Sequence, residues 1–369
     1  MRLLHLFFPE NDLALAQNLD NYTPPPAAVK LRMAGEALPM WYGNEGDRFV
    51  ASGINGAWVK KMNDLFGLDI LPFDYQPANY RPAPWGWSKA SCRVFSKLGF
   101  TSAQLPCALK LEEMRQLSHR RTAAAIGVRL VEQGIEGITA PACELRTIEE
   151  LRAFTDKNTQ AIFKLPWSSS GRGIIPADKN TFTKLMPQLE GMIQRQGSVL
   201  AEAKLDKRTD FAMLFNMEAG KASFAGLSLF QTDGFAAYAG NILLPQELIE
   251  QRICAECSST TFHAVKNALP PILEEIIGTD YDGPLGIDML TCNDGTLAPA
   301  IELNLRMTMG HLCLELYRRH VQPGAEGLFT ISTTQAKTEP VVANRRLTAG
   351  SLSLTPPGGA YSFTVTLKS

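Results

Sequence analysis

The hydrophobic pattern of the chain predicts strands and helices that alternate over much of its length. Residues 3–8 form a short apolar run, typical of a buried strand, and a polar turn at 9–12 leads into a helical stretch at 13–16. Beyond residue 118 the pattern predicts an Ala-rich helix at 120–133 ended by Gly134, another helix beginning at Thr147, a strand at 161–165, a helix at about 178–195 and a strand at 199–203. This order of elements favours an α/β architecture.

The second half of the chain has a different pattern, because its strands follow one another directly. Apolar residues alternate over 211–217, and turns are expected at 218–221 and 232–234, so residues 210–244 predict a meander. Residues 247–277 are largely helical, 284–305 predict a hairpin, and 309–320 predict a helix. The tail from about residue 326 predicts two or three short strands. Residues 20–100 are rich in Pro, Trp and Tyr and contain few periodic runs, so the pattern predicts little there.

The composition fits a globular protein of two or three domains. The 369 residues carry a net charge of −1, and 45% of them are hydrophobic. The balanced charge argues against a generally basic nucleic-acid-binding protein. No apolar run is long enough to span a membrane, and the run at the N-terminus is too short for a signal peptide and is interrupted by His5. Seven scattered cysteines suit a reducing compartment, so we expect a cytoplasmic protein.

The clearest chemical pattern lies in the strand at 299–306. Because side chains alternate between the two faces of a strand, one face is expected to be apolar and the other polar. The apolar face comprises Ile301, Leu303 and Leu305, and the polar face comprises Glu302, Asn304 and Arg306. The polar face therefore presents a carboxylate, an amide oxygen and a guanidinium in a row. A sheet edge with solvated polar residues is the alternative.

The turn before this strand determines whether Asp288 shares the polar face. A three-residue loop at 293–295 ends in Gly295, as the left-handed bulge position of such a loop requires, and it pairs Asp288 with Ala300. Glu302 is then expected on the same face as Asp288, displaced diagonally by roughly 7–8 Å. Two carboxylates at this distance can share a Mg²⁺ ion, and Arg306 can neutralise phosphate charge beside it.

A second pattern joins Lys164 to the small and basic residues at 168–173. Hydroxyl residues and two glycines allow backbone N–H groups to approach phosphates closely, while Lys164 and Arg172 supply charge. The sequence contains neither a P-loop nor a dinucleotide-binding fingerprint. By itself this stretch is equally consistent with a bare flexible turn.

Together, in chain order, these segments resemble the ATP-grasp superfamily. The resemblance rests on Phe163–Pro166 with Ser168–Gly173, Val199–Leu205, Gly286–Met289 and Glu302-x-Asn304-x-Arg306, and it covers about residues 118–320. Within that superfamily it resembles carboxylate–amine or carboxylate–thiol ligases with an ATP-binding domain like that of glutathione synthetase. It implies an ATP-grasp fold of mixed α/β and α+β class, in which two α+β subdomains enclose ATP after an α/β N-terminal domain. The expected boundaries are 1–117, 118–197, 198–325 and a short β tail at 326–369.

The resemblance also implies a set of ligand-binding residues. The nucleotide would be held by Lys164, by the loop residues Ser168, Ser169, Ser170, Gly171 and Gly173, by the hinge residues Glu202, Ala203 and Leu205, and by Asp210 at the ribose. Arg120 or Arg121 would replace the Lys that usually precedes the first helix as a phosphate ligand. Asp288, Glu302 and Asn304 would hold Mg²⁺, as two ions, and Arg306 and Arg172 would act on the phosphates or an acyl-phosphate.

The function implied is an ADP-forming ligase. Such an enzyme phosphorylates a substrate carboxylate with ATP, and an amine or thiol then attacks the acyl-phosphate. The alternatives are a phosphotransferase that stops at a phosphorylated product and an inactive nucleotide-binding sensor. The partners expected are a small carboxylic acid and an amine, with no nucleic acid and no membrane, and a homodimer is the default assembly.

Five further groups of residues each have two possible interpretations. Cys254 and Cys257 with His263 suggest zinc or redox chemistry, but packed or exposed thiols fit the helical pattern better. His311 is a substrate contact or a helix-start packing residue. Tyr238–Asn241 contact a ligand or only close the meander. Asn11 and Asp12 follow the first strand, where ligands bind, or cap a helix. Trp85 and Trp87 pack a loop or stack on a base.

Overall fold

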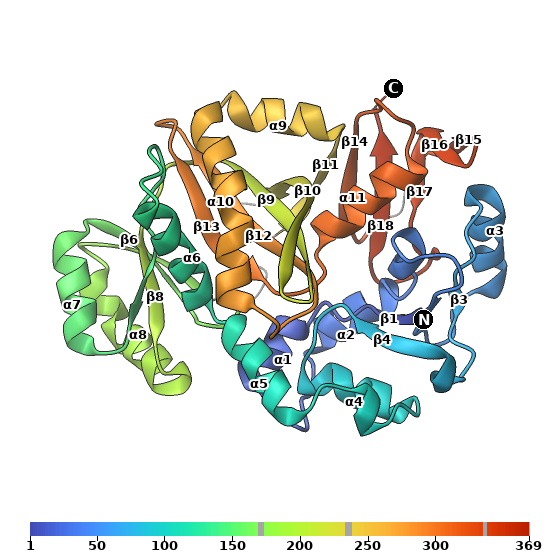
Figure 1. Cartoon of the computed structure of the whole chain (residues 1–369), viewed down its shortest axis with the longest axis horizontal. Helices are drawn as coiled ribbons and strands as arrows, with labels where there is room; N and C mark the ends of the chain where they lie inside the picture. Colours follow the sequence, from blue (N-terminus) through green and yellow to red (C-terminus); the bar gives the residue numbers. More distant parts are fainter. Residues whose placement is uncertain (169–172, 233–237, 335–337, 369) are drawn as a thin grey trace.

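A computed structural model describes residues 1–168, 173–232, 238–334 and 338–368 of the chain. Figure 1 shows a lobe that carries α7 and α8, a central sheet flanked by helices, and N-terminal elements packed below and beside that sheet. Within the described ranges, no helix is both long and apolar enough to cross a bilayer.

The N-terminal elements form a parallel α/β sheet, as the strand–turn–helix pattern at residues 3–16 predicts. Its strand order is β3-β2-β1-β4, so β2 and β4 flank β1 on opposite sides. The strands are β1 (Arg2–Leu6), β2 (Arg48–Phe49), β3 (Leu71–Pro72) and β4 (Tyr80–Pro84). The helices are α1 (Asn11–Gln17), α2 (Pro26–Ala34), α3 (Gly56–Phe66), α4 (Lys89–Lys97) and α5 (Ala108–Leu117). In an open parallel sheet, ligands bind at the carboxyl ends of the strands, where the connections from neighbouring strands run in opposite directions. The C-terminal end of β1 is such a position.

Strand β4 gives one example of why the pattern predicts little over residues 20–100. It contains Pro82 and Pro84, which have no backbone N–H to donate to a neighbour. The strand is tolerated because it lies at the edge of the sheet and pairs on one side only, with β1.

The next lobe is an antiparallel sheet with order β5-β8-β6-β7, covered on one face by two helices. Its elements are β5 (Cys143–Leu145), α7 (Ile148–Lys157), β6 (Gln160–Lys164), β7 (Ile174–Asp178), α8 (Phe182–Gln196) and β8 (Val199–Ala203). Strand β7 was not predicted, and the helix expected from about residue 178 begins at Phe182 instead. Thr147 caps α7 in a reciprocal capping box with Glu150, as the helix start predicted there requires.

The central sheet is antiparallel and runs β13-β12-β9-β10-β11-β14-β18-β17. Its strands are β9 (Lys207–Glu218), β10 (Lys221–Thr232), β11 (Tyr238–Leu243), β12 (Gly283–Cys292), β13 (Leu297–Asn304), β14 (Gly327–Ser332), β17 (Ser351–Ser353) and β18 (Ser362–Leu367). The turn expected at 218–221 is present, with Ala219 and Gly220 both at positive φ of 49° and 76°. The tail holds more strands than predicted, because β15 (Val341–Ala343) and β16 (Arg346–Ala349) form a separate hairpin.

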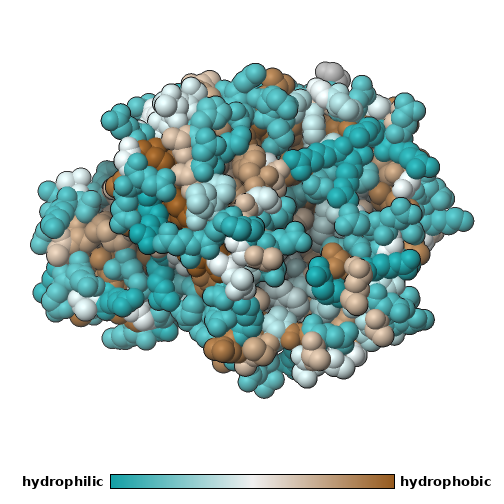
Figure 2. Space-filling view, viewed as in Figure 1, coloured by the Kyte–Doolittle hydropathy of each residue, from teal (hydrophilic) through white to brown (hydrophobic). Residues whose placement is uncertain are grey.

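Helices cover both faces of the central sheet and leave part of one face open. The helices α6 (Arg120–Glu132), α9 (Gln246–Cys254) and α10 (Ser259–Ile277) pack on the face of Phe211, Met213 and Phe215. The helix α11 (Met309–His320) packs on the opposite face, where Leu314 meets Ala212 and Leu214. Most of the surface in Figure 2 is hydrophilic, and apolar residues gather in small patches that include the junction between the α7–α8 lobe and the central sheet.

Candidate active site

The polar face of the β12–β13 hairpin brings Asp288 and Glu302 together. The two residues are direct cross-strand partners, and Asp288 also pairs with Ala212 of β9 on its other side. Directly opposed side chains in an antiparallel pair have Cβ atoms about 4.5–5.5 Å apart, which is closer than the diagonal arrangement expected. Asn304 follows two residues after Glu302 and pairs with Gly286, so its side chain shares this face.

The predicted pairing of Asp288 with Ala300 is wrong, although the predicted turn is right. Cys292 N–H donates to Thr296 O at 2.9 Å across the loop, and Gly295 has a φ of +83°. Further along, the register shifts, since Leu290 pairs with Ala298 but Asp288 pairs with Glu302. The extra residues on β13 include Pro299, which has no N–H for the ladder. The bulge moves Glu302 from a diagonal position to one directly opposite Asp288.

The same bulge changes the face of Ile301. Leu303 and Leu305 lie in the core, each 5% exposed, as the alternation predicts. Ile301 instead packs near Leu205 and Leu290, which lie outside that core. The expectation that all three apolar residues share one buried face is therefore wrong for Ile301, because an irregular strand does not keep its alternation.

The two carboxylates form a site that favours a cation. Burial, and next the negative charge of Glu302, raise the pKa of Asp288 to about 7, although Asn304 and Arg306 act in the opposite direction. Carboxylate and amide oxygens are the ligands that Mg²⁺ prefers, so the residues present fit a magnesium ion.

Arg306 is held in place by the N-terminal elements. Its Nε donates to both carboxylate oxygens of Asp12 at 3.0 Å, and its Nη2 donates to Asp12 Oδ2 at 2.6 Å and to Asn304 Oδ1 at 2.7 Å. Asp12 lies in the first turn of α1, just beyond the end of β1. The guanidinium is therefore fixed beside the carboxylate pair by a residue far away in the sequence.

Arg120 links the polar face of the β12–β13 hairpin to the segment after β6. Its Nη2 donates to Glu302 Oε1 at 2.7 Å, and its Nη1 donates to Ser168 Oγ at 3.0 Å and to Leu165 O at 3.2 Å. Arg120 begins α6 directly after its N-cap His119. Ser168, Glu302 and Arg120 are thus brought together as neighbours.

On the lobe facing this site, Lys164 and Glu202 form an ion pair. Lys164 Nζ lies 2.6 Å from Glu202 Oε1, and both side chains are mostly buried, at 7% and 14% exposure. They share one face of the antiparallel sheet, because Lys164 pairs with Leu200 and Glu202 pairs with Ile162 on adjacent strands. The opposite face of this sheet holds the core of the lobe.

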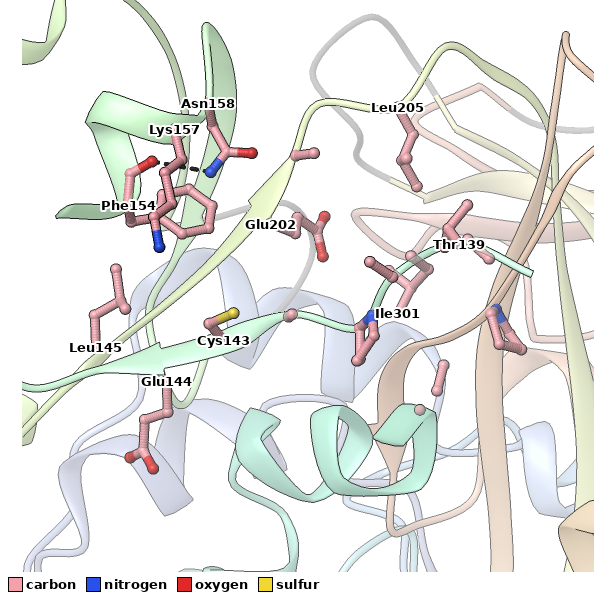
Figure 3. Close-up of a pocket in the computed structure, with 18 of the residues that line it drawn as sticks. Thr139, Cys143, Glu144, Leu145, Phe154, Lys157, Asn158, Glu202, Leu205 and Ile301 are labelled. Carbon is pink, nitrogen blue, oxygen red and sulfur yellow. Dashed lines mark hydrogen bonds between the residues drawn. The ribbon is translucent and has the colours of Figure 1, made fainter. Parts of the chain in front are cut away.

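A cavity of about 530 Å³ lies beside Glu202, between this lobe and β13. In Figure 3 the Glu202 side chain projects between Phe154 and Lys157 on one side and Leu205, Ile301 and Thr139 on the other. We call this space the hinge cavity; its lining also includes Ala203, Cys143 and Ala298–Ala300.

The backbone of Ala203 faces the hinge cavity. Lys204 N–H donates to Gln160 O, so strand alternation turns the N–H and C=O of Ala203 away from β6. On that side β5 pairs with β8 only as far as Cys143 and Ala201, so the next stretch of edge has no strand partner among the residues that the structure describes. A flat ring with its own donors and acceptors fits such an edge.

Asp210 lies at the start of β9 with its carboxylate already engaged. Lys207 Nζ lies 2.7 Å from Asp210 Oδ2, and Thr232 Oγ1 donates to the same oxygen at 2.8 Å. Asp210 occupies the same face as Asp288, because it pairs with Leu290 two residues along β12.

A second cavity, of about 590 Å³, lies over the carboxylate pair. We call it the central cavity. Three parts of the chain line it: the N-terminal elements with Asp12, Leu31 and Trp85; the central sheet with Ser228, Tyr238, Asn241, Asp288, Glu302, Asn304 and Arg306; and the C-terminal strands with Ile331–Thr333 and Tyr361. Ser228 and Tyr361 carried no signal in the sequence, since they lie in ordinary strand and turn patterns.

Four predicted residues, Ser169, Ser170, Gly171 and Arg172, lie outside the described residues. The residues on either side of them are described. Leu165 N–H donates to Gly173 O at 3.0 Å, and Gly173 has a φ of +74° that favours glycine.

Most of the remaining candidate residues have packing roles. His311 is buried at the start of α11, where its N–H donates to the N-cap Thr308, and burial lowers its pKa to about 4. Cys257 is buried in the α9–α10 core, and no cluster of three or more metal-ligating side chains occurs among the described residues. Trp85 packs edge-on to Phe7 and also lines the central cavity.

Tyr238 and Asn241 face the central cavity as well. The Tyr238 hydroxyl donates to Asn241 Oδ1, and Asn241 Nδ2 donates to Ser228 Oγ at 2.6 Å. These three side chains line the same space as Arg306 and Asp12.

Comparison with known proteins identifies the fold but not a close relative. No protein-family model matches the sequence, and no curated protein matches it. Among solved structures, biotin carboxylase from Campylobacter jejuni matches with a TM-score of 0.52 and 10% identity, covering 99% of this chain and 87% of that one. The chain has the ATP-grasp fold.

Two further ATP-grasp structures match over almost the whole chain. The biotin carboxylase domain of 2-oxoglutarate carboxylase from Hydrogenobacter thermophilus, solved with MgADP, ADP and bicarbonate, gives a TM-score of 0.51 and 13% identity, covering 100% of this chain and 86% of that one. The N5-carboxyaminoimidazole ribonucleotide synthetase of Thermus thermophilus gives a TM-score of 0.51 and 14% identity, covering 100% and 94%. The ATP-grasp fold predicted from four short motifs is therefore confirmed.

Proposed function

We propose that the protein is an ATP- and Mg²⁺-dependent, ADP-forming ligase that activates a carboxylate for attack by an amine. One observation carries the proposal: Asp288 lies directly opposite Glu302 on the floor of the central cavity, beside a fixed Arg306. The similar structures support a nucleotide at such a face, since the biotin carboxylase structures contain β,γ-ATP in one case and MgADP with bicarbonate in the other.

The nucleotide would lie across both cavities. The adenine would occupy the hinge cavity, with the backbone of Ala203 and Leu205 at its edge and Glu202 and Lys164 beside it. Asp210 would accept from the ribose hydroxyls through the oxygen that Lys207 does not hold. Ser168 and Gly173, with Ser169, Ser170 and Gly171 between them, would cradle the phosphates, and Arg120 would supply charge there.

Asp288, Glu302 and Asn304 would hold the magnesium, as two ions. The metal would polarise the phosphoryl oxygens and offset their charge. The residues of the chain would mainly position the reacting groups, as in phosphoryl transfer generally.

Arg306 would orient the substrate carboxylate in the central cavity, and Arg172 would neutralise phosphate charge. A carboxylate oxygen then attacks the γ-phosphorus, the bond to the bridging oxygen breaks, and ADP leaves with its electron pair. The amine nitrogen next attacks the acyl carbon, inorganic phosphate leaves, and the nitrogen releases its proton to solvent.

The test is release of ADP from the full-length chain with pooled carboxylic acids and amines at millimolar Mg²⁺. Turnover that needs both an acid and an amine is expected, and Glu302→Gln should abolish it, whereas Glu218→Gln, at an exposed strand end, should not. A stable phosphorylated acid formed without amine would indicate a phosphotransferase. Tight nucleotide binding without turnover across the panel would indicate a nucleotide-binding sensor. Failure of wild type to bind ATP contradicts the proposal at its root.

A further inference from the structure

Arg120 is a buried cation placed directly on one of the carboxylates of the central cavity. Its side chain is 6% exposed, and its Nη2 lies 2.7 Å from Glu302 Oε1. Glu302 is more open, at 26% exposure, and faces Asp288 across the hairpin. A fixed positive charge is thus built into the position that a divalent cation would have to share.

The position of Arg120 does not depend on Glu302. The Arg120 backbone N–H donates to Pro166 O at 3.1 Å, which ties the start of α6 to the segment after β6. Its guanidinium is held by Leu165 O and Ser168 Oγ as well. These contacts hold Arg120 in place independently of its ion pair with Glu302.

The charges around the cavity show what Arg120 does there. Asp288 and Glu302 are two acids, and Arg306 contributes little net charge because Asp12 neutralises it. Among the described residues, Arg120 is then a cation that offsets the charge of the carboxylate pair, through its contact with Glu302. A metal ion that binds Glu302 must overcome repulsion from a guanidinium only a few ångströms away.

We propose that Arg120 is the resident counter-cation of the metal site, and that it holds back divalent cations until a nucleotide arrives. The phosphates of a bound nucleotide would give Arg120 another anionic partner, so that Glu302 could bind the metal. Metal and nucleotide would therefore bind together. The inference rests on the proposed function, because it takes Asp288 and Glu302 as the metal ligands.

The test is Mn²⁺ binding to the nucleotide-free full-length protein at pH 8, followed through the electron paramagnetic resonance signal of free Mn²⁺. Arg120→Gln removes the charge and is expected to bind Mn²⁺ at least about tenfold more tightly than wild type. Arg120→Lys keeps the charge and should stay within about threefold of wild type. Arg121→Gln is the matched control, because Arg121 is the next residue of the same helix and instead approaches Gln116 and Glu144.

Unchanged or weaker Mn²⁺ binding by Arg120→Gln would overturn the inference, and weaker binding would make Arg120 a group that orients Glu302. Thermal melting of each variant checks folding, and Arg120→Met, which keeps the aliphatic stem, replaces a Gln variant that does not fold. Binding of Mg·ATP to wild type is measured in parallel. If wild type binds Mg·ATP and Arg120→Gln binds Mn²⁺ no more tightly than wild type, only this inference is wrong. If wild type does not bind Mg·ATP, the proposed function is wrong.

Discussion

Asp12 and Arg306 form a multiply hydrogen-bonded ion pair that joins the end of the first strand to the end of β13. Both partners are mostly buried, each with 17% of its side chain exposed. The pair fixes the N-terminal α/β sheet against the central sheet at the cavity where the reaction is proposed to occur. The N-terminal elements are thus part of the site and not an appendage.

Removing the Asp12 charge should therefore destabilise the whole chain. Asp12→Asn leaves a buried guanidinium without its counter-ion, and we expect a loss of about 3 kcal/mol in the free energy of unfolding. Chemical denaturation measures it. Asp20→Asn is the control, since Asp20 is 86% exposed in its pair with Lys89 and should cost less than about 0.5 kcal/mol.

A double-mutant cycle with Arg306→Gln separates the pair from other effects of the substitution. The double variant should be less damaged than the sum of the two single variants, with a coupling energy of at least about 1 kcal/mol. Additive losses would mean that the two side chains do not stabilise one another in solution.

Lys164→Met should weaken nucleotide binding more than it weakens the fold. The ammonium group lies 2.6 Å from Glu202 beside the hinge cavity and is proposed to contact ATP. We expect the dissociation constant for Mg·ATP to rise by about tenfold or more, the value of a charge-assisted contact. Isothermal titration calorimetry measures it, with Lys179→Met, on the exposed turn after β7, as control. Equal affinities for the two variants would count against a nucleotide at this position.

The central hairpin shows how far the sequence alone can predict this site. The alternation of Glu302 and Asn304 against Leu303 and Leu305, and the glycine of the 293–295 turn, follow from local geometry and are confirmed. The position of the bulge beyond the turn cannot be predicted from the sequence, because Pro299 is compatible with several ways of interrupting the hydrogen bonding between two strands. The structure places it between the Asp288–Glu302 and Leu290–Ala298 pairs.

Contacts between distant segments lay beyond prediction for a different reason. The pattern around Asp12 predicts a helix cap or a ligand contact, and no local pattern indicates a partner near residue 306. The same holds for Arg120, whose carboxylate partner lies 182 residues away. Strand β7 is not predicted by the pattern because its five residues include Pro176, a residue that argues against a strand.

The stability of the protein should fall as the pH is lowered from about 6.5 to 4, in part through His119. Burial lowers the pKa of His119 to about 4, and its Nδ1 accepts from Arg121 N–H as the cap of α6. The unfolded chain therefore binds a proton in this window that the folded chain does not, which lowers the free energy of unfolding by up to about 1.4 kcal/mol per pH unit. His311 and His320, also with pKa lowered to about 4 by burial, act in the same direction.

His119→Asn tests the share of that one residue. Asparagine keeps an N-cap acceptor but does not titrate, so the variant should remain folded and show a shallower loss of stability between pH 6.5 and 4. Urea unfolding at several pH values measures the slope. A slope identical to that of wild type would show that His119 is not held neutral in the folded protein.

Gly86→Ala should disturb the junction that holds Arg306. A Cβ atom at residue 86 would lie 2.4 Å from Asn11 Nδ2 and 3.1 Å from Arg306 Cβ, and Asn11 is only 1% exposed, so neither neighbour can move freely. We expect a loss of about 1–3 kcal/mol in unfolding free energy, as for other overpacked sites. Because Asn11 precedes Asp12, the same shift should loosen the Asp12–Arg306 pair. Gly56→Ala, with no atom within 4 Å of the added carbon, should be neutral or slightly stabilising. Placing Gly86→Ala in an Asn11→Ala background makes room for the methyl group and should recover part of the loss; an equal loss in both backgrounds would place the strain elsewhere.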